Sequence, residues 1–531
     1  MSTSAANGEN SAGHHSRLAE WAPWIVAISV MLATFMEVLD TSIASVALPH
    51  IAGSLSATNS EATWVLTSYL VANAIFLPAS NWFSLRFGRK RFLLTCVTIF
   101  TVASIFCGSA NSLGLLLFAR LVQGAGGGAL QPLAQAIMLE SFPPKKRPAA
   151  MAFYAFGIVV APVLGPTLGG WLTDNYSWRY AFYINIPVGL LAVMMIGRFV
   201  KDPHYIRDTK AGPFDNIGLG LLALWTGSLQ IILDKGQEAD WFSANWICVG
   251  FVIMVVSFAA WVWHSWTSPN PLVNLRVLKD WNFAIGCLLI TLLGLALYTT
   301  LTMLPLYYQE VMGYTALSAG LVVGPRGIGS MLGMPVIGFL GSRIDSRILM
   351  TFGFVCFAVC SLIFGAVNLS LGPYTMILPI VISGFAMTFV FVPISTQAYS
   401  NMRNQAIGNA TGIFNLLRNL GGSVGIAISQ TMLERRALFH QVQIVASAPQ
   451  TSYWLQQRVN NLQIFLAPAI GKGNARAGAY GEIYMMILQQ ARLKAFVDIF
   501  QWTALIAFLC AALVWLFHKV DPHKPPTASA H

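Results

Sequence analysis

Two acidic residues, Glu37 and Asp40, interrupt the apolar run "FMEVLDTSIASVALPH" at residues 35–50. They are three positions apart, so on a helix they lie on one face. An ionised carboxylate at the centre of a bilayer costs about 2.5–3.5 kcal/mol on insertion scales. Burial and a nearby like charge both favour the protonated form of a carboxyl group, so one of the two could exchange a proton near neutral pH.

Arg120 is the candidate counter-charge for these acids, because it also falls in an apolar run, residues 113–138. We expect Arg120 to pair with Asp40 or Glu37, and we expect protonation of the acid to release it. The alternative is a static buried ion pair that fixes the helices. A second arginine in an apolar run, Arg418, either binds an anionic substrate or donates to backbone carbonyls.

The composition is that of a polytopic membrane protein. Of 531 residues, 56% are hydrophobic and 10% are charged, against about 25% charged in soluble proteins. The net charge of +11 does not indicate nucleic-acid binding, because the basic residues are scattered through short loops. Strand alternation is absent, so a membrane barrel is not expected. No metal-ligand spacing and no nucleotide-binding loop is present, so we expect no metal and no cofactor other than protons as the coupling ion.

The chain is long enough for fourteen membrane-spanning helices, since each crossing needs roughly 20 apolar residues. Lys and Arg cluster in alternate connections, which predicts that both termini are cytoplasmic and that the protein crosses the membrane many times. The predicted spans are 24–48, 62–82, 92–110, 113–138, 149–172, 181–199, 216–234, 245–264, 283–307, 316–340, 348–367, 373–397, 408–432 and 497–518.

Similar segments indicate an internal repeat in which the first six and the last six spans are equivalent halves and the seventh and eighth are inserted; the alternative is that apolar, Gly-rich helices align by chance. The connection "NWFSLRFGRKR" (81–91) aligns with "GFLGSRIDSR" (338–347), and "QGAGGGALQP" (123–132) aligns weakly with "SGFAMTFVFVP" (383–393). Arg120 then aligns with Ile380, which confines the charge to one half. The expected organisation is a cytoplasmic tail (1–22), an N-terminal six-helix bundle (23–200), a linker with two inserted helices (201–270), a C-terminal six-helix bundle (271–518) with a long outer loop (433–496), and a second cytoplasmic tail (519–531).

Six segments carry a resemblance to a known family. They are "LDTSIASVALP" (39–49), "RFGRKR" (86–91), "RLVQGAGGGAL" (120–130), "GIVVAPVLGPTLGG" (157–170), "WRYAFYINIPVG" (178–189) and "LDKGQEADWFS" (233–243). In this order the chain resembles the major facilitator superfamily, and within it the 14-span drug:proton antiporters of the multidrug-efflux permease type. At two positions where the family's basic motif usually has Gly and Asp, this chain has Asn81 and Leu85.

The resemblance implies an all-α fold of two six-helix bundles plus two inserted helices. It also implies a secondary active transporter, not an enzyme, that exports hydrophobic or amphipathic compounds by alternating access and uses the proton gradient across a bacterial inner membrane. Asp40 and Arg120 match the family's pattern, whereas Glu37 does not. The structural motif residues carried over by the resemblance are Gly88, Arg89, Gly157, Pro162, Gly165, Pro166, Gly169 and Gly170, although ordinary close packing of small residues explains the glycines equally well.

Candidate residues for a substrate cavity are polar or aromatic side chains within the spans, each of which could instead be ordinary packing. They are Asn73, Gln123, Gln131, Tyr298, Tyr307, Phe385, Phe389, Asn415 and Arg418.

The Gln-rich outer loop, 433–496, is a candidate docking surface for a periplasmic membrane-fusion adaptor and an outer-membrane channel, or else a solvated loop. Two alternatives to multidrug efflux remain open: an exporter of one metabolite, fatty acid or siderophore, and a membrane receptor or scaffold that transports nothing.

Overall fold

The part of the chain that the structure describes is mainly α-helical, with short turns and loops between the helices. The computed structural model describes residues 5–143, 146–202, 212–341, 343–369, 372–447, 449 and 452–519, with backbone only for 5–22, and these residues contain no β-strand. Backbone groups surrounded by hydrocarbon must find hydrogen-bond partners within their own segment, which an α-helix provides. The all-α prediction is therefore confirmed.

The N-terminal half begins with a helix that starts at Ala5, well before the first predicted span. Its helices are α1 Ala5–Ser54, α2 Asn59–Phe87, α3 Arg89–Gly108, α4 Leu113–Gly127, α5 Leu130–Ser141, α6 Arg147–Asn175, α7 Tyr180–Tyr183 and α8 Asn185–Phe199. The inserted pair follows as α10 Asn216–Lys235 and α11 Asn245–Thr267, joined through the 3₁₀ turn η2 Trp241–Ser243. Most of the predicted linker, residues 203–211, lies outside the described residues.

The C-terminal half repeats this plan after the 3₁₀ turn η3 Leu275–Lys279. Its helices are α12 Trp281–Glu310, α13 Ala316–Val323, α14 Pro325–Leu340, α15 Ser346–Phe364, α16 Ile377–Ala398, α17 Asn404–Ser447, α18 Tyr453–Ile470 and α19 Lys472–Leu513, with 3₁₀ turns η4 Pro373–Met376 and η5 Val514–Leu516. Three crossings are each made of two helices: α4 with α5, α7 with α8, and α13 with α14.

Thirteen helices in the described part of the chain are long and apolar enough to cross a membrane. The remaining predicted span, 408–432, lies within α17, which packs against α12 and α19. Its Asn, Ser, Gly and Arg residues lower its hydropathy, but as a helix embedded among other helices it does not have to be apolar on every face.

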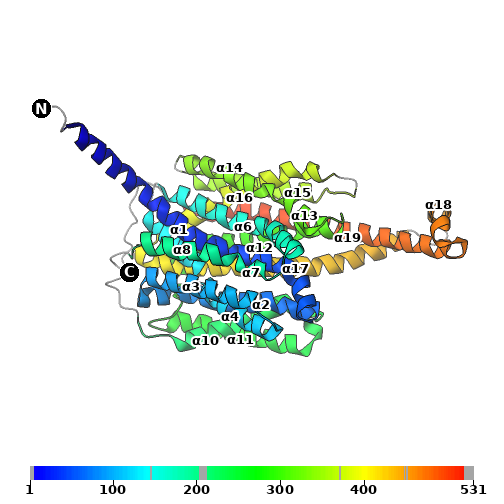
Figure 1. The fold of residues 1–531 in the computed structure, drawn as a ribbon, viewed down its shortest axis with the longest axis horizontal. Helices are drawn as coiled ribbons and strands as arrows, with labels where there is room; N and C mark the ends of the chain where they lie inside the picture. Colours follow the sequence, from blue (N-terminus) through cyan, green and yellow to red (C-terminus); the bar gives the residue numbers. More distant parts are fainter. Residues whose placement is uncertain are drawn as a thin grey trace.

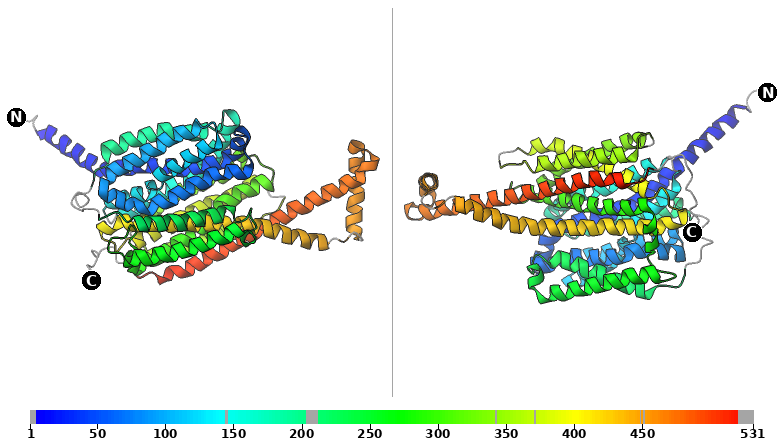
Figure 2. Two further views of the ribbon diagram at one scale, coloured as in Figure 1. Left: turned by 90° about the horizontal axis from the view of Figure 1, so that it is seen from below. Right: turned by 180° about the vertical axis from the view of Figure 1, so that it is seen from behind.

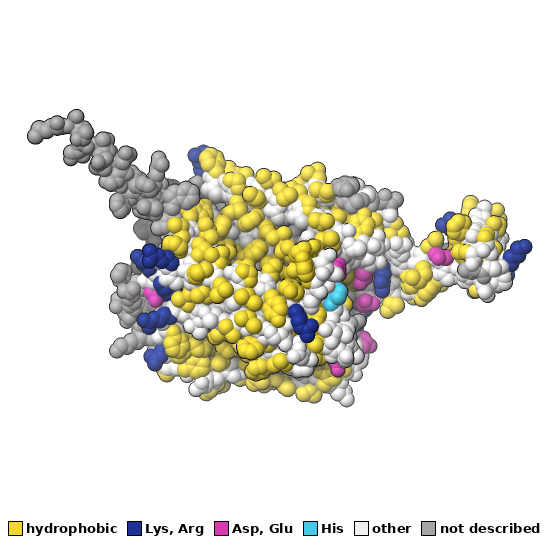
Figure 3. Space-filling model, in the orientation of Figure 1, with side chains coloured by type: hydrophobic (Ala, Val, Ile, Leu, Met, Phe, Trp, Pro, Cys, Tyr) yellow, Lys and Arg dark blue, Asp and Glu magenta, His cyan; other side chains and the backbone are white. Residues whose placement is uncertain are grey.

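Two bundles and an inserted pair make up the body of the molecule (Figures 1 and 2). Helices α1 to α8 pack together, as do α12 to α17 with α19, while α10 and α11 pack on each other and α10 also packs on α2. The bundles meet where α6 contacts α13 and α14, and where α17 contacts α2 and α5. Apolar side chains cover the broad side of the body, as expected of a surface that faces lipid (Figure 3).

The predicted outer loop is a helical projection (Figures 1 and 2). The last turns of α17 and the first half of α19 extend beyond the bundles, and α18 lies at the far end. Large apolar side chains on α18 are exposed, among them Tyr453, Trp454, Ile464 and Phe465.

Candidate functional site

The segment of α1 that carries the two acids is held against α6 by a hydrogen bond to a backbone carbonyl of α6 that has no donor within its own helix. Pro166 has no N–H, so the carbonyl of Pro162 loses its usual helical donor. The hydroxyl of Ser42 donates to that carbonyl at 3.0 Å. A Cβ on Gly165 would lie 2.1 Å from the Ser42 hydroxyl oxygen, so only glycine allows this approach of the two helices.

The other glycines of this motif also lie at helix contacts or in the protein interior. A Cβ on Gly157 would meet the Met31 side chain at 1.8 Å, Gly169 lies against Ile43, and Gly170 is buried. The motif residues of α6 therefore form the surface that holds α1. They position the acids and provide no chemical group of their own.

Helix α4 approaches α2 through a second set of glycines, which brings Arg120 to the acids. A Cβ on Gly124 would lie 2.4 Å from the Tyr69 carbonyl oxygen, and one on Gly128 would lie 2.5 Å from the Asn73 carbonyl oxygen. With these backbones in contact, the guanidinium carbon of Arg120 lies 4.3 Å from the centre of the Tyr69 ring. The glycine run thus serves the close packing of α4 against α2.

Asp40 lies at the centre of a buried polar network within the N-terminal bundle. Its Oδ2 accepts from Arg120 Nη1 at 2.5 Å, and its Oδ1 accepts from Gln123 Nε2 at 2.9 Å and from Asn185 Nδ2 at 2.7 Å. Ser104 accepts from Gln123 at 2.8 Å and from Asn185 at 3.3 Å. We call these five residues the Asp40 network.

Arg120 is held on more than one side. It is completely buried; its Nε donates to the Val65 carbonyl at 3.0 Å, and its Nη1 also donates to the Gln123 side-chain carbonyl at 2.7 Å. Asp40 is 1% exposed. A planar guanidinium is suited to such divergent contacts, which a single ammonium cannot reproduce.

Glu37 belongs to a separate network that faces the other bundle. Its Oε2 accepts from Gln131 Nε2 at 2.5 Å, and its Oε1 accepts from Asn73 Nδ2 at 3.1 Å and from the Tyr69 hydroxyl at 3.4 Å. Gln131 in turn accepts a hydrogen bond from Arg418 of α17. We call these five residues the Glu37 network; it joins α1, α2 and α5 to the C-terminal bundle.

A second amide contact runs parallel to the first. Asn415, on the same helix as Arg418, donates to the side-chain carbonyl of Gln135 at 2.6 Å. Gln131 and Gln135 are four positions apart, and Asn415 and Arg418 are three apart, so each pair lies on one helix face. Polar contacts between α5 and α17 therefore cross the interface in two successive layers.

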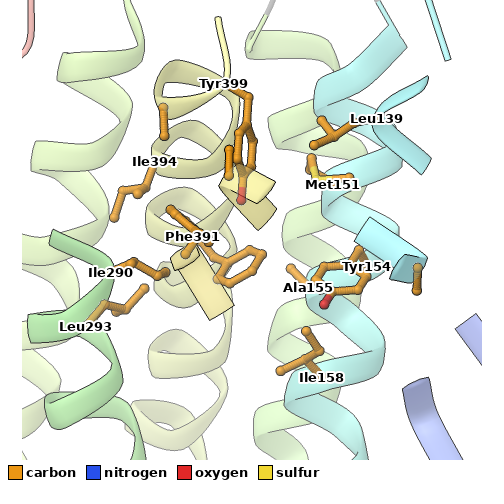
Figure 4. Packing of buried hydrophobic residues seen from close by; sticks show 14 of the residues in the cluster. Leu139, Met151, Tyr154, Ala155, Ile158, Ile290, Leu293, Phe391, Ile394 and Tyr399 are labelled. Atoms are coloured by element: carbon orange, nitrogen blue, oxygen red, sulfur yellow. The ribbon is translucent and has the colours of Figure 1, made fainter. Parts of the chain in front are cut away.

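Beside these contacts lies a small cavity between the bundles. Its walls are Ala155, Ile158, Val159, Leu293, Gly294, Leu297, Tyr298, Met387, Phe391 and Arg418. Figure 4 shows Tyr154, Ala155 and Ile158 of α6 facing Leu293 and Phe391 of the C-terminal bundle. The walls are apolar apart from Arg418 and Tyr298, but the space of about 10 Å³ holds about one water molecule. A hydrophobic ligand therefore fits between these walls only if the bundles move apart.

The other predicted cavity residues lie apart from these walls. Gln123 belongs to the Asp40 network, and Tyr307 packs on Phe496 with ring centres 5.7 Å apart. Phe385 packs on Phe389 at 4.7 Å. Among the predicted residues, Tyr298 and Arg418 line the cavity, while Asn73, Gln131 and Asn415 lie in the adjoining polar contacts.

Several polar residues of the two networks were not among the predicted site residues. Ser104 and Asn185 belong to the Asp40 network, and Tyr69 belongs to the Glu37 network and also contacts Arg120. Gln135, outside both networks, contacts Asn415 and was not predicted either. The available signal was a polar residue within an apolar run, which is costly unless it has a partner. The four-residue spacing of Gln131 and Gln135 was a further signal.

The basic motif after α2 makes a structural contact at one end of the N-terminal bundle. Gly88, with φ of 85°, ends α2 and precedes α3, a backbone conformation that favours glycine. The next residue, Arg89, pairs with Glu140 of α5 at 2.5 Å. Lys90 Nζ donates to the Gly197 carbonyl at 2.6 Å. This motif therefore joins α3, α5 and α8 even though Leu85 replaces the acid usual in the family.

No group of three or more His, Cys, Asp or Glu side chains that could hold a metal ion occurs in the part of the chain that the structure describes. The polar chemistry of the site is thus hydrogen bonding and ion pairing among carboxylates, amides, phenols and guanidinium groups.

Comparison with known proteins agrees with this architecture. The Multidrug export protein EmrB of Escherichia coli (strain K12) is 37% identical over 512 residues, covering 94% of this chain and 95% of that protein. The Fatty acid resistance protein FarB of Neisseria gonorrhoeae is 35% identical, covering 94% and 96%. The crystal structure of the human organic anion transporter MFSD10 (TETRAN) shares the fold, with a TM-score of 0.55 and 14% identity over 91% of this chain and 99% of that one.

The family profile described as Major Facilitator Superfamily matches residues 30–426, which is most of the chain. The match includes both networks, the cavity walls and the inserted pair. The multi-pass helical body, the similarity along nearly the whole length and the profile lead to one conclusion: this chain is a transporter of the Major Facilitator Superfamily, as its sequence motifs predicted.

Proposed function

We propose that this transporter is a proton-coupled multidrug exporter that moves hydrophobic or amphipathic compounds by alternating access of its two bundles. The observation that carries the proposal is the pair of buried carboxyl groups on α1: Asp40 is held inside one bundle, and Glu37 is linked to the other bundle through Gln131. Each acid can bind a proton. Protonation of either one changes the hydrogen bonds that hold the helices of the two bundles together.

The apolar cavity and the names of relatives support the choice of substrate. The cavity walls are almost entirely apolar, and the relatives at 35–37% identity are named for multidrug export and fatty acid resistance. Protons are the proposed coupling ion. Their inward movement supplies about 2.3 kcal/mol per charge per 100 mV of membrane potential, apart from the contribution of a pH difference.

The test is dye efflux in inverted membrane vesicles with an imposed pH gradient. Asp40→Asn and Glu37→Gln each remove an ionisable proton site and keep the side chain's shape. We expect each to reduce gradient-driven dye movement at least about tenfold while protein remains in the membrane. Asp240→Asn is the matched control, because Asp240 is exposed and its ion pair with Arg435, at 3.7 Å, is exposed as well. Gradient-driven efflux at the wild-type rate in both acid variants would refute proton coupling through these residues.

We infer a location in the bacterial inner membrane with both termini in the cytoplasm. Arg89 and Lys90 lie at the same end of the N-terminal bundle as Gly197, near the close of α8, and an excess of basic residues marks the cytoplasmic side. The helical projection then lies on the periplasmic side. Reporter fusions after residue 519 should report the cytoplasm, and insertions between residues 450 and 470 should report the periplasm.

The projection is the proposed docking surface for a periplasmic membrane-fusion adaptor, which would lead on to an outer-membrane channel. Trp454 and Phe465 are 77% and 79% exposed on α18, far from the membrane body. Exposed aromatic residues of this kind are typical anchors of protein interfaces. Replacing both with Ser should abolish co-purification with the adaptor; if co-purification is unchanged, the adaptor does not dock there.

A narrower function, export of one fatty acid, metabolite or siderophore, is the second candidate, and the similarity to FarB favours the fatty acid. A receptor or scaffold would transport nothing, so the vesicle assay tests it directly. Resistance profiling of a deletion strain separates the first two: sensitivity to several unrelated compounds indicates multidrug export, whereas sensitivity to one class indicates the narrower function.

A further inference from the structure

One glutamine side chain connects the ionisable Glu37 to a cation in the wall of the cavity. Arg418 can only donate hydrogen bonds, so the carbonyl end of Gln131 must face it and the NH₂ end must face Glu37. An amide in this orientation matches a carboxylate on one side and a guanidinium on the other. Gln131 is itself held in place, because the Tyr154 hydroxyl donates to its backbone carbonyl at 3.2 Å.

Arg418 has few polar contacts: its Nη2 donates to Gln131 and, at 3.5 Å, to the side-chain oxygen of Asn419. It is 1% exposed, it lines the cavity, and its Nε and Nη1 have no hydrogen-bond partner among the described residues. The guanidinium carbon also lies over the ring of Phe391, 5.9 Å from its centre. A buried cation with so few contacts is stable only while a negative charge nearby compensates it.

Glu37 is the carboxylate that provides this compensation. The titratable groups around it are Tyr69 from α2, Tyr154 from α6 and Tyr298 from α12, and the cation is Arg418 from α17. Asp40, one turn away on α1, already has its own cation in Arg120. When Glu37 takes up a proton, Arg418 therefore becomes the unbalanced charge beside the cavity.

We propose that Gln131 is a positioning residue through which a proton on Glu37 weakens the binding of uncharged apolar compounds in the cavity. With Glu37 ionised, Gln131 holds the guanidinium at the wall and the cavity stays apolar. With Glu37 protonated, the uncompensated guanidinium draws water into the cavity, because a buried charge must be solvated or paired. The inference rests on the proposed function. It adds an explanation of how an uncharged substrate competes with a proton that binds at a different residue.

The competition has a definite sign. If the proton disfavours the substrate, then the substrate disfavours the proton to the same degree, because binding couplings are reciprocal. An exchanger requires this sign: loading with substrate must release the proton, and loading with the proton must release the substrate. A substrate that instead paired with Arg418 through an anionic group would favour proton uptake by Glu37 and would couple in the opposite direction.

The test measures binding of an uncharged hydrophobic dye, N-phenyl-1-naphthylamine, to purified protein in detergent, with empty micelles subtracted. For the wild type we expect the Kd to rise about tenfold as the pH falls from about 8 to about 5, and dye addition at intermediate pH to release protons into a weakly buffered solution. Gln131→Met keeps the length of the side chain and removes both hydrogen bonds. In this variant the Kd should become independent of pH and proton release should disappear.

Two further variants keep the test decisive. Gln135→Met is the matched control, because Gln135 lies one turn along α5 and contacts Asn415 instead of Glu37 or Arg418; its pH dependence should equal that of the wild type. Arg418→Met removes the cation and should bind the dye at low pH as tightly as at high pH, which tests the same idea if Gln131→Met does not fold.

The possible failures are distinguishable. If Glu37→Gln binds the dye with the wild-type pH dependence, Glu37 is not the proton site and the proposed function needs revision at that residue. If Glu37→Gln abolishes the pH dependence but Gln131→Met and Arg418→Met retain it, the proton acts without this relay, and the inference is refuted while proton coupling stands.

Discussion

The ring of Tyr69 lies against the guanidinium of Arg120, with 4.3 Å between the guanidinium carbon and the ring centre. The hydroxyl of the same tyrosine donates to Glu37 at 3.4 Å. One side chain thus contacts the partner of Asp40 with its face and Glu37 with its edge. The two buried acids have different hydrogen-bond partners but share this neighbour. Substitutions of Tyr69 can therefore separate the contribution of the ring from that of the hydroxyl.

Tyr69→Phe should keep the ring contact with Arg120 and lose the two hydrogen bonds of the hydroxyl, to Glu37 at 3.4 Å and from Asn73 at 3.5 Å. We expect the free energy of unfolding in detergent to fall by about 1 kcal/mol, the usual net worth of a hydrogen bond. Tyr69→Leu should cost clearly more, because it also removes the face that Arg120 contacts. Thermal unfolding measures both, and Tyr453→Phe on the exposed α18 should change nothing. Equal losses for Phe and Leu would mean that the ring contact contributes no stability.

Arg120→Lys preserves the charge but loses the branched geometry. The guanidinium reaches the Val65 carbonyl, Asp40 and Gln123 at once, and one ammonium cannot do so in the same directions. We expect vesicle efflux to fall at least about tenfold with protein abundance nearly unchanged. Arg435→Lys, at an exposed ion pair, is the control. Full activity of Arg120→Lys would show that only the charge matters here.

Ser42→Ala should leave the Pro162 carbonyl without a donor, since Pro166 cannot supply one. An unsatisfied buried polar group costs about 1–3 kcal/mol, and we expect that loss in unfolding measurements. Ser45→Ala is the control, because the Ser45 hydroxyl makes only a local bond to the Ser42 carbonyl. A loss no greater than that of the control would indicate that water reaches the carbonyl.

Gly165→Ala tests the close approach of α6 to α1 from the other side. The added methyl group would lie 2.1 Å from the Ser42 hydroxyl oxygen, so the helices must separate. We expect lower stability and faster proton leak through vesicles without substrate, because α1 carries the acids. Gly197→Ala is the control, since a Cβ there meets nothing within 4 Å. If vesicles with Gly165→Ala leak protons no faster than wild-type vesicles, this motif does not control proton leak.

Asp215, outside the membrane-spanning helices, gives a prediction for pH. Burial raises its pKa, but hydrogen bonds from Gly218 N–H, Leu272 N–H and His264 lower it by more, so the net shift is downward from 3.8. A depressed pKa contributes stability that is present above the unfolded value and is lost as the pH falls through the folded one. The difference in unfolding temperature between wild type and Asp215→Asn should therefore be constant at neutral pH and shrink below about pH 4. A constant difference down to pH 3 would contradict this.

Much of the architecture could be predicted because the bilayer imposes simple rules. Runs of about 20 apolar residues must be helices, and the spans found in the sequence correspond to helices throughout the described chain. The segment 408–432 shows the limit of hydropathy: it is too polar to count as a span by composition, yet it forms part of α17. Its polar residues face Gln131 and Gln135 of the other bundle, which no local window can detect.

The sequence by itself determined that Glu37 and Asp40 share a helix face, that Arg120 lies at membrane depth, and that glycines and prolines line α6. These follow from helical periodicity and from the cost of charge in hydrocarbon, which are local properties. Only the tertiary structure decided that the two acids have different partners, Asp40 within its own bundle and Glu37 toward Arg418 across the interface. Residues three apart on a helix differ by about 60° in direction, and which neighbours they meet depends on how six helices pack around them.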